Sequence, residues 1–255
     1  MIRGFGHIPD TLEDVETDNR IRHVGGLVGR NVMFAPSRDW TPELDEVLDQ
    51  GSTNACVAHA LSNVTYLAGK AQRNPIPRIS RRWSYAVGRW VDSPNVLIDD
   101  GTRPRAMMIG SQEHGLVSER RLPWDPARVN ASADFTIDLD QSGQEAYLTG
   151  YYRVSGDVAT LCRTAIDKGH FPMLAMVVHA SFQDVDASGD VYDEPRGGEL
   201  GRHMVSLVGY RPGSILLLNS WGTGWGQNGL CWVGDRFVNS HWCSDVYVVT
   251  AAPRV

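Results

Sequence analysis

The order of the regular segments is the feature that most limits what this chain can fold into. Apolar residues recur at helical spacing in four segments, at residues 54–69, 80–91, 102–115 and 155–168. Short runs rich in β-branched and aliphatic residues, separated by turn residues, dominate the rest, at residues 171–178, 204–210, 214–218, 229–233 and 246–250. Helices followed by strands are typical of an α+β fold rather than of alternating βαβ units.

Two lobes are predicted from the turn-rich stretch at residues 123–126, which indicates a boundary near 125–150. Residues 1–49 are polar and poorly periodic, and this pattern predicts an extended segment that packs on the core rather than a separate domain. The chain is therefore expected to form a helical lobe over residues 50–125 and a β lobe over residues 126–255.

Composition and charge exclude several classes of protein. The 255 residues carry a formal net charge of −6, whereas a nucleic-acid-binding protein usually shows a basic face. The best apolar run covers residues 171–178, far short of the roughly 20 residues that span a bilayer, and residues 1–20 contain no apolar signal-peptide core. We therefore expect no nucleic-acid or membrane partner, and a location in the cytoplasm or delivery by a route that needs no signal peptide.

The four cysteines are too few for a disulfide scaffold, and none forms a zinc-binding pattern with a neighbouring histidine. Cys231 and Cys243 lie in neighbouring apolar segments and are either buried free thiols or an oxidised pair. Cys56 differs, because it lies in the first turn of the predicted helix at 54–69, for which Asn54 is the expected N-cap. A thiol at a helix N-terminus beside a protonated histidine has a pKa well below the usual value of about 8.5, which makes it a candidate nucleophile.

Three segments resemble the active-site segments of papain-like cysteine peptidases. They are DQGSTNAC, which ends at Cys56, HMVSLVGY, which begins at His203, and LNSWGTGWGQNG, which has Asn219 as its second residue. His203 follows Cys56 by 147 residues, within the range of about 130–150 residues that this family shows. The resemblance implies a papain-like two-lobed α+β fold, with a helical left lobe, a bent antiparallel β right lobe and an active-site cleft between them.

The resemblance also implies roles for residues of this site. Cys56 is expected to be the nucleophile, His203 the general base and acid, and Asn219 the residue that orients the His203 ring. The side-chain amide of Gln50 and the backbone N–H of Cys56 are expected to form an oxyanion hole. Trp221 is expected to shield the histidine–asparagine pair from water. No metal or organic cofactor is implied.

The sequence departs from the family's pattern at the residues that would bind substrate. Asn54 stands where the family has a glycine beside the S1 subsite and is expected to narrow that subsite, and Thr53 replaces a family cysteine whose disulfide is therefore absent. Only Gly101 remains of the family's Gly-Gly strand, and we expect it to contact the substrate backbone at P2 and P3. Met204 is expected to line a shallow apolar S2 subsite.

Together these features predict a cysteine endopeptidase that hydrolyses a peptide or protein substrate through a thioester acyl-enzyme. Two alternatives stay open: a transpeptidase or amide ligase on the same scaffold, and a catalytically idle member with a structural or binding role. Only 49 residues precede Gln50, too few for the family's usual helical propeptide. The enzyme is therefore either not controlled by a propeptide, or inhibited by residues 1–35 or by a partner, and the alternative for residues 1–30 is structural packing on the right lobe.

Overall fold

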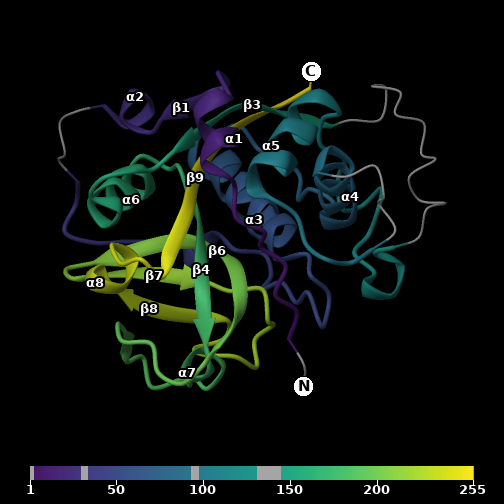
Figure 1. The fold of residues 1–255 in the computed structure, drawn as a ribbon. Helices are drawn as coiled ribbons and strands as arrows, with labels where there is room; N and C mark the ends of the chain where they lie inside the picture. Colours follow the sequence, from purple (N-terminus) through teal and green to yellow (C-terminus); the bar gives the residue numbers. More distant parts are fainter. Residues whose placement is uncertain (1–2, 30–33, 93–97, 131–144, 255) are drawn as a thin grey trace.

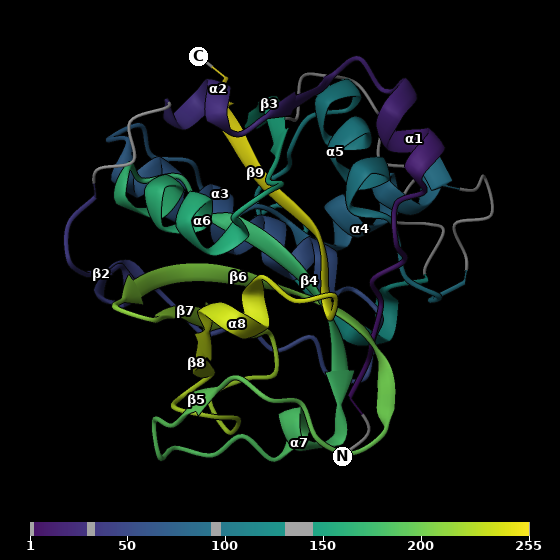
Figure 2. The ribbon, with the colours of Figure 1, turned by 60° about the vertical axis from the view of Figure 1, so that its left-hand side comes forward.

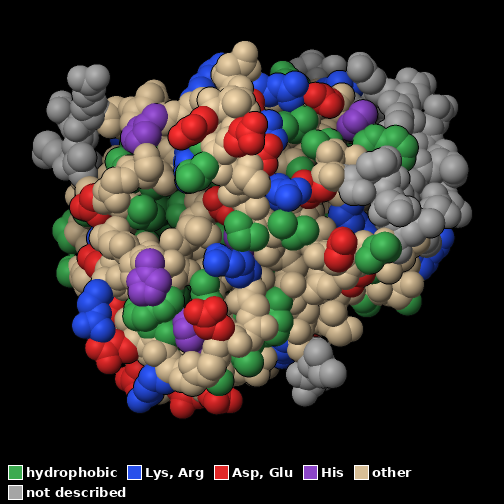
Figure 3. All heavy atoms as spheres, viewed as in Figure 1, with side chains coloured by type: hydrophobic (Ala, Val, Ile, Leu, Met, Phe, Trp, Pro, Cys, Tyr) green, Lys and Arg blue, Asp and Glu red, His purple; other side chains and the backbone are tan. Residues whose placement is uncertain are grey.

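The computed structural model describes residues 3–29, 34–92, 98–130 and 145–254. A helical half and a sheet half lie beside each other, and the N-terminal segment runs between them (Figure 1). In the rotated view of Figure 2 the same segment rises along the junction of the two halves to helix α1 (Leu12–Thr17). Acidic and basic side chains are interspersed over the face shown in Figure 3.

Helix α3 (Cys56–Ala71) is the central helix of the molecule. Its side chains are buried on nearly every side, as expected of a helix with no continuous polar face. It packs against β6 (Glu199–Arg211), where the Ser206 hydroxyl donates to the Ala60 carbonyl at 3.4 Å, and against α4 (Arg81–Asp92). Helix α5 (Pro104–Glu113) packs against α4 and completes the helical half.

The described strands form one mixed sheet of nine. Its order is β1 (Ile21–His23), β3 (Ala146–Arg153), β9 (Cys243–Pro253), β4 (Pro172–His179), β6, β7 (Ser214–Leu218), β8 (Leu230–Gly234) and β5 (Val191–Tyr192), with β2 (Arg38–Asp39) paired to β6. Neighbours are antiparallel except for the pairs β1–β3 and β5–β8. The central strand β4 is buried along its whole length and therefore lies in the core of the sheet half.

The four helices and five strands predicted from periodicity are present, with boundaries that differ by a few residues. The fourth predicted helix is α6 (Val158–Asp167), and β7 has the predicted bounds. The sequence does not predict β3, which follows a turn-rich region, or α1, which has no buried side chain and therefore no apolar face to reveal it. The other short elements are α2 (Gly25–Val28), α7 (Ala180–Gln183), α8 (Asp235–Val238) and the 3₁₀ turns η1 (Thr41–Glu43) and η2 (Pro126–Arg128).

The predicted boundary between the lobes stays a prediction. Residues 131–144, which include much of it, lie outside the described residues. All four cysteines are free, so Cys231 and Cys243 are not an oxidised pair in this structure. In the described part of the chain, no helix is both long and apolar enough to cross a membrane.

Candidate active site

Cys56 is the first residue of α3, and Ala55 rather than Asn54 occupies the N-cap position. The predicted cap at Asn54 is therefore wrong, because the Asn54 side chain binds elsewhere. The Cys56 side chain is completely buried, and backbone groups of Met204 and Gly6 hydrogen-bond to its sulfur. The first residue of the helix therefore lies against the strand that carries His203, and its thiol is not open to solvent.

His203 and Asn219 are joined across two neighbouring strands. His203 lies in β6, Asn219 follows β7, and Nε2 of the ring is 2.8 Å from Oδ1 of the amide. The same Oδ1 accepts the Ser220 backbone N–H at 2.8 Å, which fixes the amide orientation because a backbone N–H can only donate. Nε2 of His203 must therefore carry a hydrogen, and in the neutral ring the lone pair lies on Nδ1, which is buried without a hydrogen-bond partner.

Trp221 covers this pair. Its ring stacks on the His203 ring with centroids 4.9 Å apart and an interplanar angle of 30°. Phe182 and Trp225 pack edge-on against Trp221 at 5.6 Å each, so the indole is fixed from behind. The side chain is buried, and this arrangement keeps water away from the His203–Asn219 hydrogen bond.

Gln50 is buried, and its amide is held from both ends. The Ser220 hydroxyl donates to Oε1 at 2.6 Å, while Nε2 donates to the carbonyl oxygens of Thr53 at 2.7 Å and Gly4 at 3.2 Å. The predicted oxyanion donor therefore already binds two carbonyl oxygens, of which the Gly4 oxygen belongs to the N-terminal segment of the same chain. Sequence reasoning misses Ser220, although it directly follows Asn219.

Residues 3–8, which we call the plug, fill the space over Cys56. Two of them have no room for a side chain: a Cβ at Gly4 would lie 1.8 Å from the Thr53 oxygen, and a Cβ at Gly6 would lie 1.6 Å from the Asn54 oxygen. Both obstacles are backbone atoms, which cannot swing aside as a flexible side chain does. The two glycines are what allow the plug to lie this close to the residues that precede α3.

The plug is hydrogen-bonded to both halves of the molecule. The Thr102 N–H donates to the Gly6 oxygen at 3.0 Å, and the Ile8 N–H donates to the Thr102 oxygen at 3.2 Å. On the other side, the His7 N–H donates to the Arg202 oxygen of β6 at 3.4 Å. The plug therefore binds across the cleft as an extra strand between the helical half and the sheet.

Thr102, rather than Gly101, supplies the backbone groups that bind this occupant. The Gly101 N–H instead donates to the Tyr85 hydroxyl at 3.0 Å, and a Cβ at Gly101 would lie 2.3 Å from the Gly6 oxygen. Gly101 thus provides the space that the bound strand needs, and its predicted contact with the substrate backbone stays a prediction. Met204 is completely buried, and its predicted place in the S2 subsite also stays a prediction.

Asn54 forms a bridge between the helical half and the plug. Its Nδ2 donates to the Asp99 carbonyl at 2.6 Å, and its backbone N–H donates to the Asp99 carboxylate at 3.0 Å. The amide oxygen is left facing the plug, where it accepts the Phe5 N–H at 3.0 Å. This side chain occupies space at the cleft wall that a glycine would leave open.

Burial dominates the electrostatics of the closed site. It raises the pKa of Cys56 to about 11, against the hydrogen bonds from Met204 and Gly6. Burial also lowers the pKa of His203 to about 4, which its bond to Asn219 only partly offsets. The closed site therefore holds a neutral thiol and a neutral imidazole at pH 7, contrary to the low thiol pKa that the sequence predicts.

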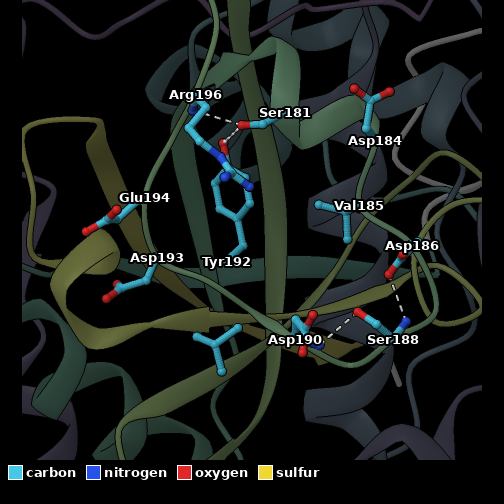
Figure 4. Close-up of a pocket in the computed structure, with 11 residues that line it drawn as sticks. Ser181, Asp184, Val185, Asp186, Ser188, Asp190, Tyr192, Asp193, Glu194 and Arg196 are labelled. Atoms are coloured by element: carbon cyan, nitrogen blue, oxygen red, sulfur yellow. Dashed lines mark hydrogen bonds between the residues drawn. The ribbon is translucent and has the colours of Figure 1, made fainter.

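A cavity of about 500 Å³ lies elsewhere, at the loop between α7 and β5 (Figure 4). Within this loop the Ser188 N–H donates to the Asp186 carboxylate at 2.8 Å, and the Asp190 N–H donates to the Ser188 hydroxyl at 3.2 Å. None of the predicted catalytic residues lines this cavity. Among the residues that the structure describes, no group of three or more His, Cys, Asp or Glu side chains could hold a metal ion.

Comparison with known proteins places these observations in a family. The family model of the papain family cysteine proteases matches residues 35–246. An uncharacterized peptidase C1-like protein of Acanthamoeba polyphaga mimivirus is 25% identical over 223 residues, which cover 82% of this chain and 70% of that protein. Papain from Carica papaya is 35% identical over 81 residues, which cover 31% of this chain and 23% of papain.

Solved structures share the fold over nearly the whole chain. Xylellain, a cysteine protease from Xylella fastidiosa, has a TM-score of 0.76 at 22% identity, with 97% of this chain and 96% of that chain covered. A procathepsin B from Trypanosoma congolense has a TM-score of 0.72 at 17% identity, with 98% and 86% covered. The predicted two-lobed α+β architecture is confirmed by these similarities.

Proposed function

Because the chain belongs to the papain family of cysteine proteases, we propose that it is a cysteine peptidase kept latent by its own residues 3–8. The observation that carries the proposal is the bond from Gln50 Nε2 to the Gly4 oxygen, beside a fully buried Cys56. A donor that would bind the oxyanion of a substrate is occupied by a carbonyl of the plug. Catalysis therefore requires the plug to leave the cleft.

Once the cleft is open, the sulfur of Cys56 attacks the carbonyl carbon of the scissile peptide bond, and Nδ1 of His203 takes the thiol proton. The developing oxyanion accepts hydrogen bonds from the Gln50 amide and the Cys56 backbone N–H. His203 then gives its proton to the leaving amine, the carbon–nitrogen bond breaks, and a thioester remains on Cys56. A water molecule, deprotonated by His203, hydrolyses the thioester, and the thiol recovers the proton. Asn219 holds the ring in the tautomer that this cycle needs.

The test compares cleavage of a fluorogenic peptide by the intact chain and by the variant Gly6→Ala. The added methyl group collides with the Asn54 backbone, so it should expel the plug and raise the cleavage rate at least tenfold. Gly26→Ala is the matched control, because a Cβ at Gly26 meets nothing within 4 Å and its rate should equal that of the intact chain.

Two further measurements separate the outcomes. Adding Cys56→Ala to the Gly6→Ala variant should abolish turnover, and residual cleavage would contradict the assigned nucleophile. If the Gly6→Ala variant folds but does not cleave faster, the plug does not control the site. Product analysis with an excess of a free amine distinguishes hydrolysis from amide transfer, since a transferase would yield the amide of the added amine.

A further inference from the structure

The plug ends in a second cluster of polar contacts, which we call the latch. It consists of His7 and Asp10 from the N-terminal segment and Asp245 and Tyr247 from β9. Nε2 of His7 is 3.0 Å from the Asp245 carboxylate, and the Asp10 N–H donates to the same carboxylate oxygen at 3.1 Å. The Tyr247 hydroxyl donates to the Asp10 carboxylate at 2.8 Å. The latch therefore ties the end of the plug to the sheet.

The latch holds two carboxylates in a poorly solvated place. The His7 and Asp245 side chains are 0% and 6% exposed, and they form an ion pair when His7 is protonated. The Asp10 carboxylate accepts hydrogen bonds from the Tyr247 hydroxyl and, at 3.4 Å, from the backbone N–H of Arg105 in α5. The Arg105 guanidinium is 21% exposed and pairs with Asp18 at 2.9 Å and with Asp14 at 3.7 Å. The negative charge on Asp10 is therefore only weakly compensated, beside a second carboxylate on Asp245.

The position of the latch lets it act on the whole plug. The next residues of the chain form α1, which has no buried side chain. Asp18, where Arg105 and Tyr151 bind, is the next firm anchor of the chain. The latch lies between the plug and this anchor. Its contacts must break before residues 3–10 can leave the cleft, with α1 acting as the hinge.

We propose that the latch is a proton-dependent switch, closed while Asp10 carries a proton and opened when Asp10 loses it. This inference rests on the proposed blocking of the cleft by the plug. Loss of the proton places two negative charges side by side in the latch, and the plug is released toward neutral and mildly alkaline pH. The plug is therefore released as the pH rises, and acid keeps it docked.

The direction follows from the two states of Asp10. Burial, and then the nearby Asp245, raise its pKa from 3.8 to about 7 in the docked plug. A group whose pKa is raised in the docked state stabilises docking fully below the undocked pKa, and this stabilisation is lost as the pH rises through about 7. With a pKa of 3.8 in the undocked segment and about 7 in the docked plug, the equilibrium constant for docking falls about 100-fold between pH 5 and pH 8.

The experiment measures alkylation of Cys56 by iodoacetamide, with mass spectrometry of the modified peptide, from pH 5 to pH 9. Intact protein is compared with Asp10→Asn, which cannot ionise and should keep the latch closed. Because both proteins carry the same Cys56 and His203, the ratio of their rates cancels the ionisation of the thiol. The intact protein should react faster than the variant at any pH above 3.8, and the ratio of the two rates should rise about 100-fold between pH 5 and pH 8.

The matched control is Asp186→Asn in the loop between α7 and β5. That carboxylate is exposed, and hydrogen bonds from Ser188 lower rather than raise its pKa, so the variant should follow the intact protein at every pH. Equal rates for Asp10→Asn and intact protein at pH 8 would overturn the proposal.

A second variant protects the test against a folding defect in Asp10→Asn. Tyr247→Phe removes the hydroxyl that stabilises ionised Asp10, so the pH at which labelling accelerates should rise, and an unchanged profile would count against the latch. Labelling needs no turnover. A working latch in a protein that cleaves no peptide would therefore refute only the peptidase, and active enzyme with a flat labelling ratio would refute only the latch.

Discussion

The Ser220 hydroxyl donates to Oε1 of Gln50 at 2.6 Å and thereby decides which way the Gln50 amide faces. Its backbone N–H simultaneously donates to Oδ1 of Asn219 at 2.8 Å. One residue thus orients both the proposed oxyanion donor and the amide that holds the His203 ring. The two bonds use different groups of Ser220, so they can be separated by mutation.

Ser220→Ala removes the bond to Gln50 and keeps the bond to Asn219. In the Gly6→Ala background, kcat should fall about tenfold, the value of one hydrogen bond of about 1.4 kcal/mol, while KM changes little. Steady-state kinetics on a peptide substrate measures both constants. Ser188→Ala, in an exposed loop, should leave them unchanged, and an effect of Ser220→Ala on KM alone would contradict the positioning role.

Gln50→Ala removes the donor itself. Loss of one oxyanion donor typically lowers kcat by about 10²–10³, and the effect should appear in kcat because the bond forms mainly in the transition state. The same variant also loses the bond to Gly4, so in the otherwise intact chain it should weaken the plug. Iodoacetamide labelling of Cys56 should then speed up while peptide cleavage slows, and parallel changes in the two rates would argue against the double role.

Opening the cleft should change the titration of Cys56. Burial is the main cause of its raised pKa, about 11, so exposure to water should lower it, and the helix N-terminus and His203 should lower it further. The alkylation rate of Gly6→Ala should therefore reach its plateau below about pH 8.5. Adding His203→Ala should move this profile back toward alkaline pH. If the open variant still titrates near pH 11, the thiol is not activated.

Asn54→Ala tests the bridge to the plug. The change removes the acceptor of the Phe5 N–H and the donor to the Asp99 carbonyl. Loss of the plug's bond, at about 0.5–1.5 kcal/mol, should raise Cys56 labelling about 2- to 10-fold at constant pH. The smaller side chain should also admit larger P1 residues in a peptide panel. An unchanged P1 preference would show that Asn54 does not narrow the subsite.

The sequence predicts the parts of the fold that have strong periodicity. The helix that begins at Cys56 and the strand at 214–218 are apolar and local, so their patterns survive in the folded chain. The cap at Asn54 is predicted wrongly because both ends of its side-chain amide bind distant partners: Nδ2 donates to the Asp99 carbonyl, 45 residues away, and Oδ1 accepts the Phe5 N–H, 49 residues away. Local propensity cannot anticipate such a partner.

The path of the N-terminal segment is the largest feature that the sequence leaves undecided. Gly4 and Gly6 look like ordinary flexible residues until Thr53 and Asn54 are placed opposite them. In the same way, Asp10 and Asp245 are 235 residues apart and meet only in the folded chain. The pKa of Cys56 follows from this arrangement, because the plug is one of the segments that bury it.

The plug is covalently part of the protein that it blocks, so a free peptide must compete with a tethered segment for the cleft. A segment on a short tether faces its site at an effective concentration of the order of millimolar. A peptide present at micromolar concentration is therefore outnumbered about a thousandfold, even if it binds as well as residues 3–8. Diluting the protein does not change this ratio. Activation must accordingly come from a change in the chain itself, in its protonation, its sequence or its integrity, and not from the amount of enzyme.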